Sequence, residues 1–189
     1  MELKDLEDIV EDMILQLSYP GLDSRSLNIS LPMSANNAPV KLFVQALNSE
    51  SVNVKLSALR WLYSRPGAAK HNLSKIGFLL EDNDSWVRKE AIKTIEITKV
   101  FEPDLISKIT LLLKDNDQVV RIEAAKCLGN LLKEMPKAAL NTKSKNVVDL
   151  KLLKENAIKG LQEASEDSVQ EVKRKAIKSL RKLGAFTAT

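Results

Sequence analysis

The sequence predicts an all-α protein, built as a right-handed α–α superhelix in which helical hairpins stack in a row. Three observations predict this class. Nearly the same thirteen residues occur twice, as LLEDNDSWVRKEA from Leu79 and as LLKDNDQVVRIEA from Leu112. The apolar residues of both copies recur with helical spacing. The composition is 44% hydrophobic and only 4% aromatic, and it favours the good helix formers Ala, Leu, Lys and Glu.

The second helix of each predicted hairpin contains a pattern that repeats along the chain. A valine is followed four residues later by an alanine, and further apolar residues follow at i+5 and i+8 from the valine. The valine–alanine pairs are Val54 and Ala58, Val87 and Ala91, Val120 and Ala124, and Val172 and Ala176. This spacing describes one face of an α-helix. A small alanine at the same place in each copy indicates a close approach of two helices.

A first amphipathic helix is predicted ahead of the second helix in the first three copies. Its apolar residues are Val40, Phe43, Ala46 and Leu47 in the first copy, Leu73, Ile76, Leu79 and Leu80 in the second, and Leu105, Ile106, Ile109, Leu112 and Leu113 in the third. One hairpin cannot bury its apolar face by itself, so the units must stack on one another.

The repeated DND sequence predicts how the turn of each hairpin is built. Asp84 and Asp117 stand directly before the second helix, where an aspartate caps the exposed N–H groups of the first turn. Its charge also suits the positive end of the helix. Arg88 and Arg121 lie one turn further on and can reach an aspartate of their own or of the neighbouring turn. The sequence therefore predicts an Asp–Arg ladder along one edge of the array.

The pattern LLxDxDxxVRxxAAxxL, found at 112–128 and in close form at 79–95, resembles the second half of a HEAT repeat. The resemblance covers roughly residues 37–184 and implies a HEAT-like α-solenoid of about four helical hairpins. The period of 33 residues between Leu79 and Leu112 is shorter than a typical HEAT unit. It is similar to the short HEAT-like repeats of phycobilisome lyases.

We predict one α-solenoid domain over residues 1–189. Residues 1–18 are expected to form an amphipathic N-terminal helix that caps the array, and residues 19–36, which contain Pro20 and Pro32, a loop. The expected repeats are 37–66, 67–99, 102–135 and 147–184. The fourth copy follows after 52 residues instead of 33, which indicates an insertion around 135–149.

The residues needed for catalysis or for a metal site are scarce. His71 is the only histidine and Cys127 the only cysteine, and the sequence contains no nucleophile–base set or phosphate-binding glycine loop. Cys127 is expected to be a small core residue and His71 a surface residue. We therefore expect no catalytic residue, no metal ligand and no cofactor, and a protein that is not an enzyme.

A basic column is the first candidate for a partner-binding surface. The position two residues after each repeat alanine is Arg60, Lys93, Lys126 and Lys178, and it points away from the apolar face toward the expected concave surface. The alternative is an ordinary solvated helix face, interrupted by Glu90, Glu96 and Glu123.

Trp86 is the second candidate, at the rim of the same surface. It stands between the turn and the second helix and could anchor a partner, as in tubulin-binding HEAT-like arrays. The alternative is that it packs against the adjacent turn.

The function that these features favour is a non-enzymatic scaffold that binds a protein partner with an acidic surface. Nucleic-acid binding by the same groove is an alternative, as is a phycobilin lyase or chaperone-like factor by analogy with short HEAT-like repeats.

The basic C-terminal helix could bind an acidic partner or a membrane surface, although a capping role explains it more simply. No apolar run approaches the ~20 residues of a membrane span. We expect a cytoplasmic protein, because a lone cysteine suits a reducing compartment.

Overall fold

The structure is a computed structural model that describes residues 40–135 and 145–186. Within these residues every regular element is a helix, and no strand occurs. The predicted N-terminal helix over 1–18 and the loop over 19–36 lie outside the described residues.

The helices follow the order that the repeat predicts. They are α3 (Val40–Ala46), α4 (Val52–Tyr63), α5 (Pro66–Lys70), α6 (Leu73–Phe78), the short 3₁₀ helix η1 (Leu79–Glu81), α7 (Ser85–Thr98), α8 (Pro103–Leu111), the 3₁₀ helix η2 (Leu112–Lys114), α9 (Gln118–Leu131), α10 (Lys145–Ala164) and α11 (Gln170–Leu183). The second helices of the predicted hairpins are α4, α7, α9 and α11.

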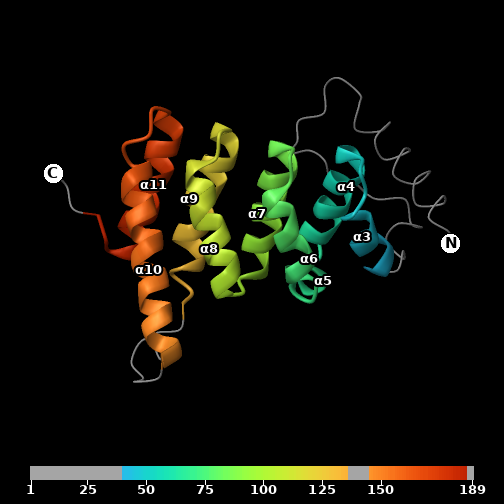
Figure 1. The fold of residues 1–189 in the computed structure, drawn as a ribbon, viewed down its shortest axis with the longest axis horizontal. Coiled ribbons are helices and arrows are strands. Elements are labelled where there is room, and N and C mark those ends of the chain that lie inside the picture. Colours follow the sequence, from blue (N-terminus) through green and yellow to red (C-terminus); the bar gives the residue numbers. More distant parts are fainter. Residues whose placement is uncertain (1–39, 136–144, 187–189) are drawn as a thin grey trace.

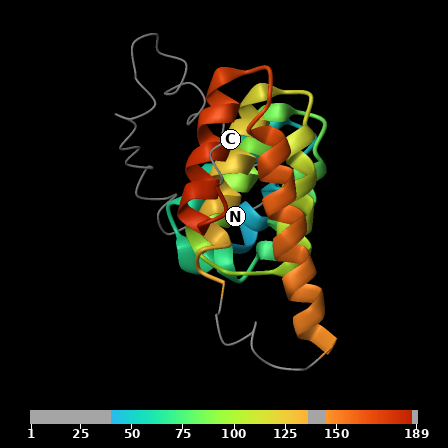
Figure 2. The same cartoon turned by 90° about the vertical axis from the view of Figure 1, so that its left-hand side faces the viewer.

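The hairpins form a single row (Figure 1). Each second helix contacts the next, from α4 to α7, α9 and α11, and each also packs against the first helix of its own hairpin, α3, α6, α8 or α10. Figure 2 views the row from the end at which α10 and α11 lie. The predicted class, an all-α solenoid of stacked hairpins, is therefore confirmed for the described residues.

The repeated valine and alanine positions form the centre of the core. Val87, Val120 and Val172 are completely buried, and Val54 packs against the core while partly buried. The four repeat alanines are at most 1% exposed. Each buried valine contributes roughly 1.5–3 kcal/mol of hydrophobic stabilisation. One predicted core residue differs, because Val40 in the first turn of α3 is 41% exposed.

The first helix of the second hairpin is divided into two pieces. A proline at the first helical position starts α5, and α6 begins only at Leu73. Between them the side-chain amide of Asn72 donates to the backbone oxygen of Ala68 over 2.9 Å. This local bond offers the backbone an alternative to a continuous helix. His71 in the same break is exposed, as expected.

The turns contain the predicted caps. The Asp84 carboxylate accepts hydrogen bonds from the N–H groups of Trp86 and Val87, at 2.9 and 3.1 Å. The Asp117 carboxylate accepts one from Val119 at 2.9 Å. An aspartate side chain thus satisfies two of the free N–H groups in the first turn of α7 and one in the first turn of α9. These caps fix where the two helices begin.

The predicted ladder runs from each unit to the next one. Its rungs join Lys55 to Asp82 at 2.6 Å, Arg88 to Asp115 at 2.8 Å and Arg121 to Asp167 at 2.8 Å. Both arginines bind their carboxylate through two nitrogens, a geometry that lysine cannot reproduce. Arg88 also donates to the backbone oxygens of Asp82 and Asn83 in its own turn. Arg121 does the same with Asp115 and Asn116, so each arginine rung ties two consecutive turns together.

Candidate partner-binding surface

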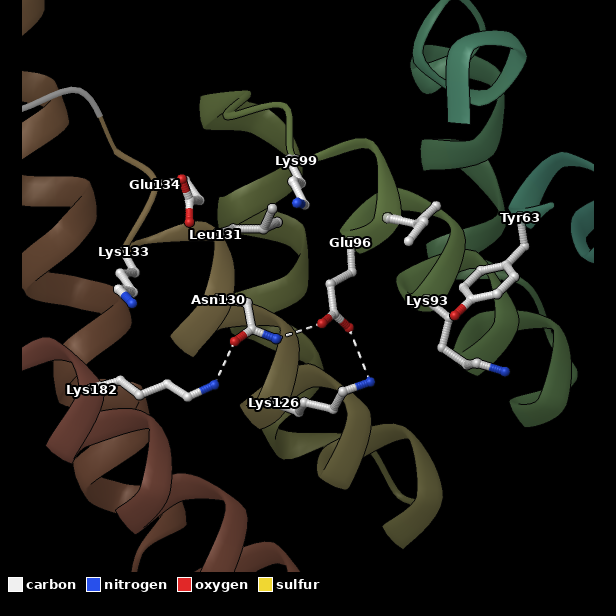
Figure 3. A pocket seen from close by; sticks show the side chains of 11 residues that line it. Tyr63, Lys93, Glu96, Lys99, Lys126, Asn130, Leu131, Lys133, Glu134 and Lys182 are labelled. Atoms are coloured by element: carbon white, nitrogen blue, oxygen red, sulfur yellow. Dashed lines mark hydrogen bonds and ion pairs between the residues drawn. The ribbon is translucent and has the colours of Figure 1, made fainter. Parts of the chain in front are cut away.

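The second helices α4, α7, α9 and α11 together form a pocket of about 300 Å³ near their C-terminal ends (Figure 3). We call it the lysine pocket. It is lined by five lysines (Lys93, Lys99, Lys126, Lys133 and Lys182), by Glu96 and Glu134, and by Tyr63, Ile97, Asn130 and Leu131. Lysines outnumber carboxylates, so the pocket favours a negatively charged ligand.

Lys126 lies in a network of carboxylates. Its ammonium donates to Glu123 at 2.7 Å and pairs with Glu96 at 3.2 Å. Burial lowers the pKa of Lys126, but the hydrogen bond to Glu123 and the charges of Glu123 and Glu96 outweigh it, so that the pKa is raised overall. Lys126 is therefore cationic at neutral pH, and much of its charge is already balanced.

Lys93 is balanced in the same way. Its ammonium donates to both oxygens of Glu90, at 2.9 and 3.0 Å, and lies 5.4 Å from the centre of the Tyr63 ring. Glu90 and Glu123 each precede the predicted lysine by three residues, on the same helix face. The two central members of the basic column are thus bound to acids of their own helices.

A chain of hydrogen bonds holds three helices together across the pocket (Figure 3). The Asn130 amide on α9 donates to Glu96 on α7, and the Asn130 side-chain oxygen accepts from Lys182 on α11 at 2.6 Å. Glu96 consequently has two partners, Asn130 and Lys126. This network joins α7, α9 and α11 at the pocket and balances the charge of Glu96, so that Glu96 does not repel an acidic ligand.

Lys99 and Lys133 differ from the other lysines of the pocket. Both are exposed, and within the described residues neither forms an ion pair with a carboxylate. Lys99 follows α7 with a left-handed backbone, at a φ of 53°. Glycine is the usual residue at such a helix end, and Gly184 does occupy the same conformation after α11, at a φ of 66°.

The structure brings only two of the five predicted contact residues together. Lys93 and Lys126 line the lysine pocket, whereas Lys178 on α11 lines a separate hollow. Arg60 on α4 is exposed and outside both.

Trp86 lies at the opposite end of α7. It is about 15 Å along the helix axis from Glu96, since ten residues rise 1.5 Å each. Its side chain is 52% exposed, and the Lys89 ammonium lies 4.4 Å from the centre of its ring. The ring is thus available at the surface, with one face next to a cation.

Three lysines of the lysine pocket were not among the contact residues predicted from the sequence. Lys99, Lys133 and Lys182 sit in the last turn of a helix or just beyond it, outside the positions that repeat. Lysine is common at helix C-termini because it offsets the negative end of the helix, so the residue type alone gives no signal. The left-handed backbone of Lys99 could not be read from the sequence.

Cysteines and clusters of metal-ligating side chains are common components of catalytic sites. Cys127 is completely buried, and burial raises the pKa of its thiol well above the usual value, as expected for an unreactive core residue. Among the described residues no three His, Cys, Asp or Glu side chains gather as metal ligands would. In that same part of the chain, none of the helices has the length and hydropathy of a bilayer span.

Comparison with known proteins identifies the repeat. Residues 40–129 match the family model described as HEAT repeats. This part of the chain is therefore similar to HEAT repeats, a class of helical solenoids that typically act as protein-interaction scaffolds. None of the curated proteins compared with the chain matches its sequence.

Several solved structures are similar in fold. An engineered protein is 20% identical, with a TM-score of 0.48 over 98% of this chain and 100% of that one. The CpcE–CpcF complex of phycocyanin lyase from Nostoc sp. is 18% identical, with a TM-score of 0.47 over 78% of this chain and 66% of that one. A designed armadillo repeat protein in complex with the peptide (KR)4 is 18% identical, with a TM-score of 0.43 over 95% and 90%.

Proposed function

We propose that the protein is a non-enzymatic scaffold that binds an acidic segment of a partner protein at the lysine pocket. The wider contact surface consists of the predicted residues Arg60, Trp86, Lys93, Lys126 and Lys178, joined by Lys99 and Lys133. Repeat solenoids bind their partners on such extended helical surfaces. The buried Cys127 thiol suits a reducing compartment, and on that ground we also propose a cytoplasmic location.

Lys99 is the observation that carries this proposal. A left-handed backbone costs a residue with a side chain about 1–2 kcal/mol. The chain uses glycine at the equivalent end of α11 but a lysine at the end of α7, where the side chain lines the pocket. Strained backbone of this kind concentrates at functional sites. We therefore attribute the choice of lysine instead of glycine at position 99 to an interaction of its ammonium group with a carboxylate of the partner.

The lysines of the pocket divide into two roles. Lys93 and Lys126 are held by Glu90, Glu96 and Glu123, and they give the surface a fixed shape. Lys99 and Lys133 are exposed and able to pair with carboxylates of the partner. Pairing across such a rim affects the rate of association and the choice of partner more than the affinity.

A pocket of about 300 Å³ is at the lower end of the range for ligand sites. It would hold one side chain of the partner against Tyr63 and Leu131 more readily than a large cofactor.

The proposal is tested by capturing partners from native lysate on immobilised protein and identifying them by mass spectrometry, with and without nuclease. Wild type is compared with the double variant Lys99→Glu, Lys133→Glu. We expect nuclease-resistant capture of one or more acidic proteins, reduced at least fivefold in the variant.

A matched control is Lys70→Glu, Lys75→Glu, which makes the same change of charge at exposed positions of α5 and α6 that do not line the pocket. It should capture partners as wild type does. Equal recovery by all three proteins would contradict the assignment of the pocket. An equal loss in both variants would mean that only net charge matters.

A further inference from the structure

The exposed side of α11 lines a second hollow, of about 730 Å³. Five bases line it: Lys173, Arg174, Lys178, Arg181 and Lys182. None of its lining residues is acidic, and Ile177 is the single apolar one. We call it the α11 hollow. The helix that lines it, α11, lies at the end of the row that Figure 2 shows nearest the viewer.

The positive charge of the α11 hollow is much less balanced than that of the lysine pocket. Within the described residues, α11 contains one acid, Glu171, which pairs with Arg174 at 2.6 Å on the exposed surface. Exposed pairs of this kind are weak and exchange readily for another anion. Lys178 and Arg181 are exposed and have no carboxylate partner among the described residues.

The apolar face of α11 is buried against the rest of the array, which argues against a membrane as the ligand. Val172, Ala176 and Leu180 are buried in the core, where α11 packs on α9. A helix that binds a bilayer surface inserts its apolar face between the lipids. Here that face is covered by the core. Ile177, which is half-buried, is the single apolar residue that lines the α11 hollow.

The spacing of the bases suits a regular row of phosphates. They lie on successive turns, as the pairs 173–174 and 181–182 with Lys178 between them. From the first pair to the last is about 12 Å, because eight residues rise 1.5 Å each. Phosphates of one DNA strand follow at about 3.4 Å along the axis, so roughly three lie within this span. Arg174 and Arg181 can each bind a phosphate through two nitrogens.

We propose that the α11 hollow binds the phosphate backbone of a nucleic acid without reading its base sequence. This site goes beyond the proposed scaffold function; it adjoins the lysine pocket, with Lys182 lining both, and Lys178 also belongs to the wider contact surface proposed above. A backbone contact needs cations in a row and no base-specific groups. The α11 hollow supplies these, whereas the lysine pocket does not.

The test uses the full chain and a fluorescein-labelled 20-base-pair DNA duplex, with binding followed by fluorescence anisotropy at several salt concentrations. We expect measurable binding at low salt that weakens as salt rises. The slope of log affinity against log salt should be about −3, which corresponds to about three phosphate contacts. Absence of binding at low salt would overturn the proposal.

The variant Arg174→Glu, Arg181→Glu changes two exposed side chains and leaves the buried face of α11 intact. It should weaken duplex binding at least tenfold and reduce the slope by about two. The variant Arg174→Gln, Arg181→Gln should weaken binding less, and circular dichroism shows whether both remain folded. The control Lys70→Glu, Lys75→Glu carries the same change of charge far from α11 and should bind like wild type. An equal loss in the control would overturn the proposal.

Two further measurements separate this site from its competitors. The variant Lys99→Glu, Lys133→Glu should bind the duplex normally, so that failure of the scaffold function leaves this result unaffected. If it loses binding as much as the α11 variant does, the site has been assigned to the wrong surface. Polyglutamate or anionic vesicles that bind as tightly as the duplex, and whose binding is lost in the α11 variant, would show that a different anion is the ligand.

Discussion

At the scale of single residues, Lys99 joins a local strain to a proposed contact. Replacing it with glycine removes the cost of the left-handed backbone, and we expect the free energy of unfolding to rise by about 1 kcal/mol. The same change removes an ammonium from the lysine pocket and should reduce partner capture. Urea unfolding and affinity capture measure the two effects. A variant that is more stable and still captures its partner would contradict the role of Lys99.

Asp115 illustrates the ladder at the same scale. Its carboxylate accepts two hydrogen bonds from Arg88 and one from the N–H of Asp117. The substitution Asp115→Asn leaves the partly buried guanidinium without its counter-charge, and we expect it to destabilise the fold by about 2 kcal/mol. Chemical unfolding measures the change.

The matched control for Asp115→Asn is Glu171→Gln, which also converts the acidic partner of an arginine to an amide. The pair of Glu171 and Arg174 is exposed, with side chains 40% and 63% accessible. Water and salt screen it, so this change should have little effect on stability. Equal effects of the two substitutions would mean that the ladder contributes no more than a surface ion pair.

Asp167 gives the ladder a dependence on pH. Hydrogen bonds from Arg121 are the main cause that lowers the pKa of Asp167 below its ordinary value of 3.8. A carboxylate with a lowered pKa stabilises the folded state at pH values above its unfolded pKa. That contribution is lost as the pH falls below about 4 toward the folded pKa. In Asp167→Asn, unfolding free energies measured between about pH 7 and pH 2.5 should therefore fall less steeply than in wild type.

At the scale of the helices, α9 and α11 approach each other closely at Gly129. A Cβ atom added there would lie 2.9 Å from the Cα of Ser179 and would also meet the Ser179 side chain, whose hydroxyl donates to the backbone oxygen of Ala125. Because backbone cannot move aside, Gly129→Ala should destabilise the protein by about 1–3 kcal/mol despite the better helix propensity of alanine. Gly67→Ala, which meets nothing within 4 Å, is the control for thermal unfolding.

The helices themselves could largely be predicted from the sequence, because apolar periodicity and aspartate caps are local features that repeat. The buried faces could be predicted from Val87, Val120 and Val172. The starts of α7 and α9 could be predicted from Asp84 and Asp117. The division between α5 and α6 could not be predicted in the same way. It lies at Asn72, whose side-chain amide donates to the Ala68 carbonyl, and the residues 33 positions before and after it are Pro39 and Leu105, so no repeated residue marks the break.

At the scale of the whole molecule, the fold could be predicted more fully than the site. The ladder was predictable because Arg88 and Arg121 recur in register with their aspartates. The lysine pocket was predictable only in part, since it is assembled from the ends of four second helices. Lys93 and Lys126 belong to the repeating pattern, but their neutralisation by Glu90, Glu96 and Glu123 depends on rotamers and on the distance between helices. We propose the division into units at 37–66, 67–99, 102–135 and 147–184 on the same repeating pattern.

The ladder has one consequence for how the array could change in length. Each rung points forward by one unit, and the turn it meets is built alike in the second and third units, since Asp82 and Asp115 are 33 positions apart. Excision of residues 67–99 would present Lys55 with the carboxylate of Asp115 in place of that of Asp82. The interior units are thus interchangeable parts, and a shortened chain should still melt cooperatively as a helical protein, at a lower temperature.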